Sequence, residues 1–126
     1  MSALIDTSVF IALEAGRSLA ATPPAGGVSA MTLAELHLGV LASKSPGARA
    51  KRLGTVSWVE NAFDPIPFDE VVARRFAEVM VSSRRRGTKL RTADAIIAAT
   101  AVAYDLDLYT QDADFDGVPG LRVVRG

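Results

Sequence analysis

Short apolar segments alternate with segments of helical character along the chain, and this alternation limits the choice of fold more than any other feature. Apolar runs that suit short strands occur at residues 3–5, 28–30, 66–68, 108–110 and 121–124. Helical patterns occupy most of the sequence between them, at 7–14, 32–42, 48–61, 70–86 and 93–105. Strands separated by helices are typical of a parallel sheet covered on both faces. The alternation predicts an α/β fold, a three-layer α/β/α sandwich with a central parallel sheet.

The starts of the predicted helices carry residues that commonly cap helices. Thr7 or Ser8 is expected to cap the first helix. Thr32 is expected to cap the second, with Glu35 three residues on as its capping-box partner. Thr92 is expected to cap the long apolar helix near the end of the chain, which is apolar almost all round and should therefore be buried.

Length and composition bound the remaining choices. A chain of 126 residues suits one domain, so we expect a single domain over residues 1–126. Fourteen basic residues balance fourteen acidic ones, which excludes a global attraction to nucleic acid or to an acidic membrane. The absence of Cys and the presence of one His exclude thiol nucleophiles, Cys-type zinc sites and multi-His metal motifs.

Neither a targeting segment nor a membrane span is predicted. The apolar N-terminus lacks a basic region and is interrupted by Asp6, so it does not match a secretory signal. The uncharged stretch at 95–104 is about half of a ~20-residue membrane span. We therefore expect a cytoplasmic protein without a membrane partner.

Four carboxylates stand in apolar surroundings, where surface charges are not expected. Asp6 directly follows the first predicted strand, Asp112 follows the fourth, Asp94 begins the most apolar helix, and Glu35 lies between two leucines. Ligands of parallel α/β sheets bind beyond the carboxyl ends of the strands. Carboxylates gathered there raise one another's pKa values unless a cation compensates them, and all-oxygen ligands favour Mg²⁺, with Mn²⁺ as a substitute.

Each acid also has a purely structural interpretation. Glu35 could serve only the capping box, and Asp94 only the helix dipole. Asp112, Asp114 and Asp116 could form a solvated turn. The segment that holds these three aspartates resembles the start of a calcium loop. The twelfth position of that loop holds Val123 instead of a glutamate, so an EF-hand is excluded.

Basic residues concentrate at one place, just before the most apolar helix. This run contains Arg84, Arg85, Arg86, Lys89 and Arg91. Cations at the end of a helix complement its dipole and stay solvated. The alternative is a contact with RNA phosphates at the edge of the acidic site, and a patch this small suits a single-stranded or looped RNA.

Other enzyme classes lack their motifs. The sequence contains no phosphate-binding loop and no dinucleotide fingerprint. A Ser-His-Asp triad would need His37, which lies two residues from Glu35 and so on a different face of its helix. We interpret His37 as structural or as a surface residue.

Three segments together resemble a known family. They are LIDTSVFIAL near the N-terminus, TLAELHLGVL after the proline-containing loop, and TADAIIAATAVAYDLDLYTQDADFDGVPGLRVV near the end. In this order they resemble PIN-domain ribonucleases, and more narrowly the VapC-like toxins of bacterial toxin–antitoxin pairs. The resemblance covers the whole chain, and the third segment is its most specific part.

The resemblance implies a PIN-like fold and a set of acids that hold Mg²⁺. By position, this set would be Asp6, Glu35, Asp94 and Asp112, supported by Thr110. Asp114 and Asp116 leave the fourth acid open, because either could share or replace the role of Asp112. The resemblance also implies a homodimer and a cognate antitoxin whose tail blocks the site.

These observations lead to one main hypothesis and two alternatives. We expect a Mg²⁺-dependent endoribonuclease, the toxin of a toxin–antitoxin pair, that hydrolyses RNA phosphodiesters with a metal-activated water. The first alternative is a protein of the same fold that binds RNA or antitoxin with little turnover. A more distant one is a Mg²⁺-dependent phosphatase acting on small phosphate esters.

Overall fold

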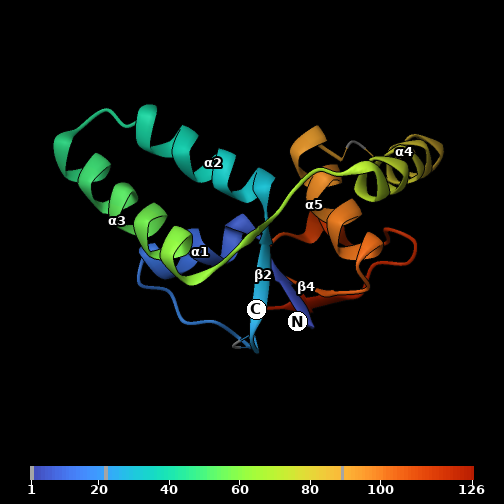
Figure 1. The fold of residues 1–126 in the computed structure, drawn as a ribbon, viewed down its shortest axis with the longest axis horizontal. Helices are drawn as coiled ribbons and strands as arrows, with labels where there is room; N and C mark the ends of the chain where they lie inside the picture. The colour runs from blue at the N-terminus through green and yellow to red at the C-terminus, as the bar shows by residue number, and fades with distance from the viewer. Residues whose placement is uncertain (1, 22, 89) are drawn as a thin grey trace.

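In a computed structural model, which describes residues 2–21, 23–88 and 90–126, the chain forms a five-stranded sheet with helices on both faces (Figure 1). The strands are β1 (Ala3–Ile5), β2 (Gly26–Ser29), β3 (Pro65–Ile66), β4 (Asp107–Thr110) and β5 (Val123–Arg125). The helices are α1 (Thr7–Glu14), α2 (Ala30–Leu41), α3 (Pro46–Ala62), α4 (Glu70–Arg85) and α5 (Thr92–Ala103), with a 3-10 turn η1 (Ala113–Phe115). The predicted α/β/α sandwich is confirmed.

The first strand of the chain lies at the centre of the sheet. The strand order is β3-β2-β1-β4-β5, and all neighbours are parallel. From β1 the chain builds outward through β2 and β3, and then adds β4 and β5 on the other side of β1. The direction of winding thus reverses between β1 and β4. Such a reversal opens a crevice at the carboxyl ends of the strands, which is where open α/β sheets bind ligands.

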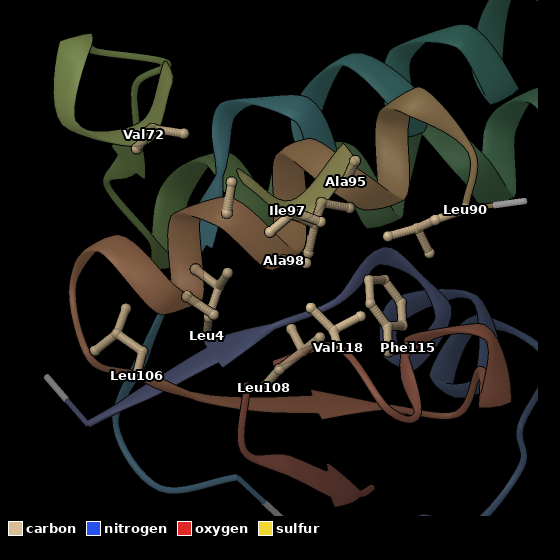
Figure 2. Packing of buried hydrophobic residues seen from close by; sticks show 13 residues of the cluster. Leu4, Val72, Leu90, Ala95, Ile97, Ala98, Leu106, Leu108, Phe115 and Val118 are labelled. Carbon is tan, nitrogen blue, oxygen red and sulfur yellow. The ribbon is translucent and has the colours of Figure 1, made fainter. Parts of the chain in front are cut away.

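Alternate residues of β1 face the two helical layers. Leu4 is fully buried in a cluster with Leu108 of β4 and Ile97 of α5, on the side covered by α4 and α5 (Figure 2). Ile5 points to the opposite side and packs in a second cluster with Val28 of β2 and Phe10 of α1. This alternation follows from the two-residue repeat of a strand. Because β1 is buried on both faces, its residues are all apolar, and Asp6 is the first polar side chain after it.

The α5 helix is buried on nearly all sides, as its composition predicts. It packs against α4 and α2 as well as against β2 and β4. Its buried residues run from Asp94 to Ala101, interrupted only at Ile96. Small alanines let α5 approach its neighbours closely, so the acid at its start is held in a fixed position.

Three predicted helix caps are wrong by one to three residues. The cap of α1 is Asp6, whose side chain accepts the backbone N–H of Ser8. The cap of α2 is Ser29, because the helix begins at Ala30 and not after Thr32. Arg91 precedes α5, and Thr92 is its first helical residue. In each case the helix starts as soon as the preceding strand or loop ends, which frees the predicted capping side chains for other contacts.

The strand boundaries also shift. The strand predicted at 28–30 is β2, which spans Gly26–Ser29 and so includes two glycines before the predicted start. A side chain at Gly26 would lie 3.0 Å from the carbonyl oxygen of Ala3, so glycine here permits the close pairing of β2 with β1. The strand predicted at 66–68 is the two-residue β3, and the last strand ends at Arg125 and not at 124. Within the part of the chain that the structure describes, no helix is both long and apolar enough to cross a membrane.

Candidate active site

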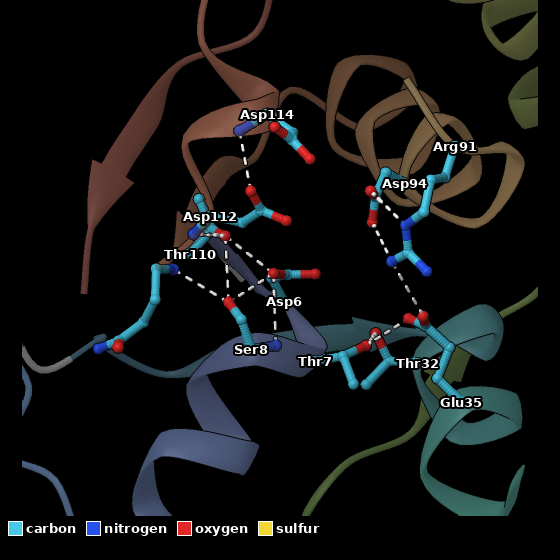
Figure 3. A network of polar contacts seen from close by, with 11 residues as sticks. Asp6, Thr7, Ser8, Thr32, Glu35, Arg91, Asp94, Thr110, Asp112 and Asp114 are labelled. Carbon is cyan, nitrogen blue, oxygen red and sulfur yellow. Dashed lines mark hydrogen bonds and ion pairs between the residues drawn. The ribbon is translucent and has the colours of Figure 1, made fainter. Parts of the chain in front are cut away.

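The four acids singled out in the sequence come together at the carboxyl end of the sheet (Figure 3). Asp6 follows β1, Asp112 follows β4, and Glu35 projects from α2, which follows β2. Asp94 lies in the first turn of α5. The reversal of the winding direction between β1 and β4 therefore brings together acids that are as far as 106 positions apart in the numbering of the chain.

Asp6 is held by one of its two carboxylate oxygens. Its Oδ2 accepts hydrogen bonds from the Ser8 hydroxyl at 2.6 Å, from the Ser8 backbone N–H at 3.3 Å, and from the Thr110 hydroxyl at 2.8 Å. No hydrogen bond from the described residues reaches Oδ1, which points to the side of the site where Asp94 lies (Figure 3). Asp6 is only 3% exposed, so the fixed carboxylate presents one oxygen to the site.

Ser8 and Thr110 also fix the loop that follows β4. The backbone N–H of Gln111 donates to the Ser8 hydroxyl at 3.0 Å. The N–H of Asp112 donates to the Thr110 hydroxyl at 3.0 Å. The two hydroxyls lie 3.2 Å apart. Ser8 and Thr110 thus join the turn after β1 to the turn after β4, and set Asp6 and Asp112 relative to each other.

Glu35 is oriented by the hydroxyl group of Thr7 rather than by a capping box. The Thr7 hydroxyl lies 2.8 Å from Oε1 of Glu35 and 3.0 Å from the Thr32 hydroxyl. Thr32 is fully buried in the first turn of α2, where its hydroxyl contacts that of Thr7. The structural interpretation of Glu35 as a capping residue is therefore excluded, because Ser29 and not Thr32 caps α2.

Arg91 lies at the mouth of the site and joins two of the acids. Its Nε and Nη2 donate to the two oxygens of Asp94, both at 3.1 Å, and Nη2 lies 3.5 Å from Oε2 of Glu35. The Arg91 side chain is 64% exposed, whereas those of Asp94 and Glu35 are 4% and 17% exposed. The cation therefore covers the acids from the solvent side.

A further acid of the site, Asp114, comes from η1. Asp94, Asp112 and Asp114 each place one carboxylate oxygen within 4.8 Å of the others, an arrangement that fits a metal ion. The Asp112 carboxylate also accepts the N–H of Asp114 at 2.9 Å and so starts η1. The structure does not bring Asp116 to the site, because its carboxylate pairs with Arg125 at 2.7 Å.

Burial sets the electrostatics of the site. It raises the pKa of Asp94 above its ordinary value, and the hydrogen bonds and charge of Arg91 oppose this shift. Burial likewise raises the pKa of Glu35, opposed by the Thr7 hydrogen bond and by Arg91, while the charges of Asp94 and Asp6 add to the rise. Ionised acids in this place are thus costly, and a cation among them reduces the cost.

The basic run divides into two parts, and Lys89 lies outside the described residues. Arg84, Arg85 and Arg86 are exposed at the end of α4, whereas Arg91 turns to the acids. A guanidinium nitrogen of Arg86 lies so close to Gly117 that a Cβ there would meet it at 2.8 Å. Arg86 therefore lies against the loop that follows η1, a short way along the chain from Asp112 and Asp114.

Sequence reasoning missed the contribution of the small hydroxyl residues and of Arg91. Thr7, Ser8 and Thr32 were assigned to helix caps, and Arg91 to the RNA-binding run. A signal was available for two of them, since Thr7 and Ser8 directly follow Asp6 and the turn of a helix brings one of them back over it. Thr32 lies three residues before Glu35 on α2, a spacing that also places side chains together on a helix.

Comparison with known proteins agrees with this geometry. The family described as PIN domain matches residues 3–121. This match defines the chain as a PIN-domain protein.

Similar proteins show to which group of PIN-domain proteins the chain belongs. Ribonuclease VapC4 of Mycobacterium tuberculosis (strain ATCC 25618 / H37Rv) is 43% identical over 97% of this chain and 95% of its own. Ribonuclease VapC5 of the same strain is 39% identical over 97% and 93%. A crystal structure of VapBC-5, a member of the VapBC family of toxin-antitoxin systems from Mycobacterium tuberculosis, is 35% identical with a TM-score of 0.88, covering 99% of this chain and 98% of that one. The chain belongs to the VapC ribonucleases.

Proposed function

We propose that this protein is a Mg²⁺-dependent endoribonuclease that hydrolyses RNA phosphodiesters and acts as the toxin of a toxin–antitoxin pair. The observation that carries the proposal is the convergence of Asp6, Glu35, Asp94 and Asp112 at the point where the winding of the sheet reverses. Membership of the VapC ribonucleases gives this acidic site its substrate class.

The acids fit a hard divalent cation. Asp94, Asp112 and Asp114 offer carboxylate oxygens close enough to share one ion, and Asp6 presents its Oδ1 from the neighbouring strand. An all-oxygen set favours Mg²⁺, with Mn²⁺ as a substitute, over zinc. A bound cation would polarise the phosphodiester and lower the pKa of a water. We assign Asp6, Asp94 and Asp112 as ligands, direct or through water, with Asp114 beside them.

The protein's own groups have separate tasks in this proposal. Thr110 and Ser8 fix Asp6, and Thr7 orients Glu35, which binds the cation or orients the attacking water. Attack in line on the phosphorus leaves a 3′-hydroxyl and a 5′-phosphate. No side chain is assigned as a covalent nucleophile. His37 lies on the surface, 3.2 Å from Glu60, and has no task in the reaction.

RNA binding is assigned to the exposed end of α4. Arg84, Arg85 and Arg86 present guanidinium groups to solvent, and Arg86 lies against the loop next to η1. Guanidinium groups pair with phosphate oxygens in bidentate fashion. A patch of this size supports a single-stranded or looped RNA as substrate.

The partners follow from the same kinship. Solved structures of similar fold include a toxin-antitoxin complex from Klebsiella pneumoniae at 32% identity, and VapBC-5, a member of the VapBC family of toxin-antitoxin systems, at 35%. We assign a cognate antitoxin and a homodimer to this chain, in the cytoplasm where the RNA is. Large apolar side chains exposed on α1, α2 and α3 support a protein partner, among them Ile11, Leu38 and Trp58.

A second candidate keeps the fold but loses turnover, so that the protein binds RNA or antitoxin only. The full set of acids favours the nuclease, because a binding protein has no need to retain four buried or half-buried carboxylates. A phosphatase acting on small phosphate esters is the more distant alternative, and it would hydrolyse a chromogenic ester and leave RNA intact.

The test is cleavage of a structured RNA pool by antitoxin-free protein, with Mg²⁺ and with EDTA. Asp94→Asn removes one buried acid, and Asp64→Asn removes an exposed acid as the matched control. We expect Mg²⁺-dependent cuts with 5′-phosphate ends that Asp94→Asn abolishes and Asp64→Asn retains. Folded protein that binds Mg²⁺ and RNA without cutting under any condition would favour the binding protein instead.

A further inference from the structure

Arg91 occupies a position where local physics disfavours a cation. It is the N-cap of α5, and no side chain caps this helix end. Ser, Thr, Asp and Asn are the residues that stabilise an N-cap, and a positive charge at a helix N-terminus opposes the helix dipole. Local rules broken in this way are expected where a residue serves function. Interactions other than those of the helix end must therefore favour an arginine at position 91.

The contacts of Arg91 identify these interactions. The guanidinium spans two acids from different elements, Asp94 of α5 and Glu35 of α2, with three contacts between 3.1 and 3.5 Å. Among the described residues, Arg91 is the basic side chain that pairs with these site acids, since the other ion pairs lie elsewhere on the surface. It thus supplies the positive charge that the buried carboxylates need.

The same contacts are easily given up. The Arg91 side chain is 64% exposed, so solvent can hydrate it as soon as it leaves the acids. Solvent screens the exposed end of these ion pairs, which lowers their net contribution to stability. The carboxylates, by contrast, are nearly buried and gain much less hydration if the contact is broken. A divalent cation that binds to Asp94 therefore meets a competitor that can be displaced at low cost.

We propose that Arg91 is a built-in counter-ion that holds Asp94 and Glu35 in the metal-free protein and is displaced when the divalent cation binds. Once displaced, the guanidinium remains at the mouth of the site, where it is free to bind a substrate phosphate. The inference rests on the proposed function for the identity of the cation, but its test does not depend on RNA cleavage.

The first experiment measures Mn²⁺ binding to the full chain by calorimetry. Arg91→Gln removes the competing charge, and we expect Mn²⁺ to bind about two- to fivefold more tightly, as the loss of a solvent-screened ion pair implies. Arg91→Lys keeps the charge without the two-pronged contact and should give a smaller gain. Arg74→Gln is the matched control, because Arg74 pairs at 3.8 Å with Glu70 on the surface of α4. The affinity of this variant for Mn²⁺ should equal that of the natural protein.

The second experiment observes Arg91 itself. The Nε–H of Arg91 donates to Asp94, and its NMR signal should shift or be lost on addition of Mg²⁺, which is diamagnetic. The Nε–H of Arg122 donates to Asp107 at 2.5 Å, outside the site, and provides an internal control that should not change.

The outcomes separate this inference from the proposed function. If metal binds to the natural protein while the Arg91 signal stays in place, or if Arg91→Gln weakens Mn²⁺ binding, Arg91 orders the acids for the metal and the inference is overturned. The proposed metal-dependent reaction would then still stand. If neither the natural protein nor Arg91→Gln binds Mn²⁺ or Mg²⁺, both are overturned together.

Discussion

Asp6 combines two roles within a single turn of the chain. Its carboxylate caps α1 through the Ser8 N–H, and the same group lies at the centre of the acidic site. An acid at an N-cap is locally favourable, because it pairs with the helix dipole. The cap thus offsets part of the cost of placing a charge that is only 3% exposed. Loss of the charge should consequently affect the reaction more than the fold.

The first prediction concerns Asp6→Asn, which keeps the size of the side chain and a carbonyl acceptor. We expect RNA cleavage to fall about a hundredfold or more, since several kcal/mol of transition-state stabilisation depend on the metal ligands. The free energy of unfolding in EDTA should be unchanged or higher, because repulsion among the acids is relieved. Cleavage rates at saturating Mg²⁺ and denaturant titrations check both parts. A variant with natural activity would remove Asp6 from the mechanism.

The second prediction concerns Ser8, whose hydroxyl joins the turns after β1 and β4. Ser8→Ala removes the donor to Asp6 and the acceptor for the Gln111 N–H. We expect the free energy of unfolding to fall by about 1–2 kcal/mol, and cleavage to fall less than in Asp6→Asn. Ser18→Ala, at an exposed position, is the control and should change neither quantity. If the two variants cleave RNA equally well, Ser8 does not position Asp6.

At the scale of elements, the sequence predicts which segments form strands and helices better than where they begin. The order of strands and helices could be predicted because apolar runs and helical periodicity are local. The start of α2 could not, since both Ser29 and Thr32 are good caps and the choice depends on where β2 leaves the sheet. Thr32 and Glu35 have the spacing of a capping box, but the same spacing allows both to contact Thr7, a residue that only the fold brings near.

The residues of the candidate site also fall into those that the sequence predicts and those that only the fold identifies. Asp6, Asp94 and Asp112 could be selected because a charge next to an apolar segment is conspicuous in sequence. Arg91 could not be assigned, because it belongs to a basic run whose other members are solvated, and only the turn into α5 directs it to the acids. Similarly, the choice of Asp114 over Asp116 depends on η1, which turns one to the site and the other to Arg125.

The third prediction belongs to the end of α4. Replacement of Arg84, Arg85 and Arg86 by Ala removes three exposed charges without touching the acids. We expect weaker RNA binding and a shallower dependence of the binding constant on salt, because fewer counterions are released from the phosphates. Titrations of a non-cleaved RNA with the Asp6→Asn background, at several salt concentrations, measure the slope. A slope equal to that of the parent would mean that these arginines are only solvated charges at a helix end.

The molecule as a whole is electrically neutral, with fourteen charges of each sign, yet several acids are concentrated at one edge of the sheet. Arg91 compensates part of this local negative charge, and the remainder is unfavourable to the folded state whenever no metal cation is bound. Since burial raises the pKa of Glu35 above its ordinary 4.5, the folded protein binds more protons than the unfolded chain in the interval above that value. Stability contributed by this group falls as pH rises through the interval, and stays lower above it.

The fourth prediction isolates this effect with Glu35→Gln, which keeps the acceptor for Thr7 but cannot ionise. In EDTA, the difference in unfolding free energy between the variant and the natural protein should grow in favour of the variant as pH rises from about 4.5. Saturating Mg²⁺ at pH 7 should reduce or reverse the difference, because the cation stabilises the ionised acid. Denaturant titrations from pH 4 to 8 test this. A difference in unfolding free energy that does not vary with pH would show that burial does not raise the pKa of Glu35.

The central position of β1 has a consequence for the synthesis of this protein. The strand that is made first acquires its β4 neighbour late, and Asp6 meets the Thr110 hydroxyl across a separation of 104 residues. A nascent chain that ends before β4 lacks Asp112 and Asp114 as well as the second half of the sheet. An enzyme that cleaves RNA would otherwise be a hazard to the ribosome that makes it. Here the acids come together only after β4 and the loop that follows it have been made, so we expect a chain interrupted before that point to lack cleavage activity.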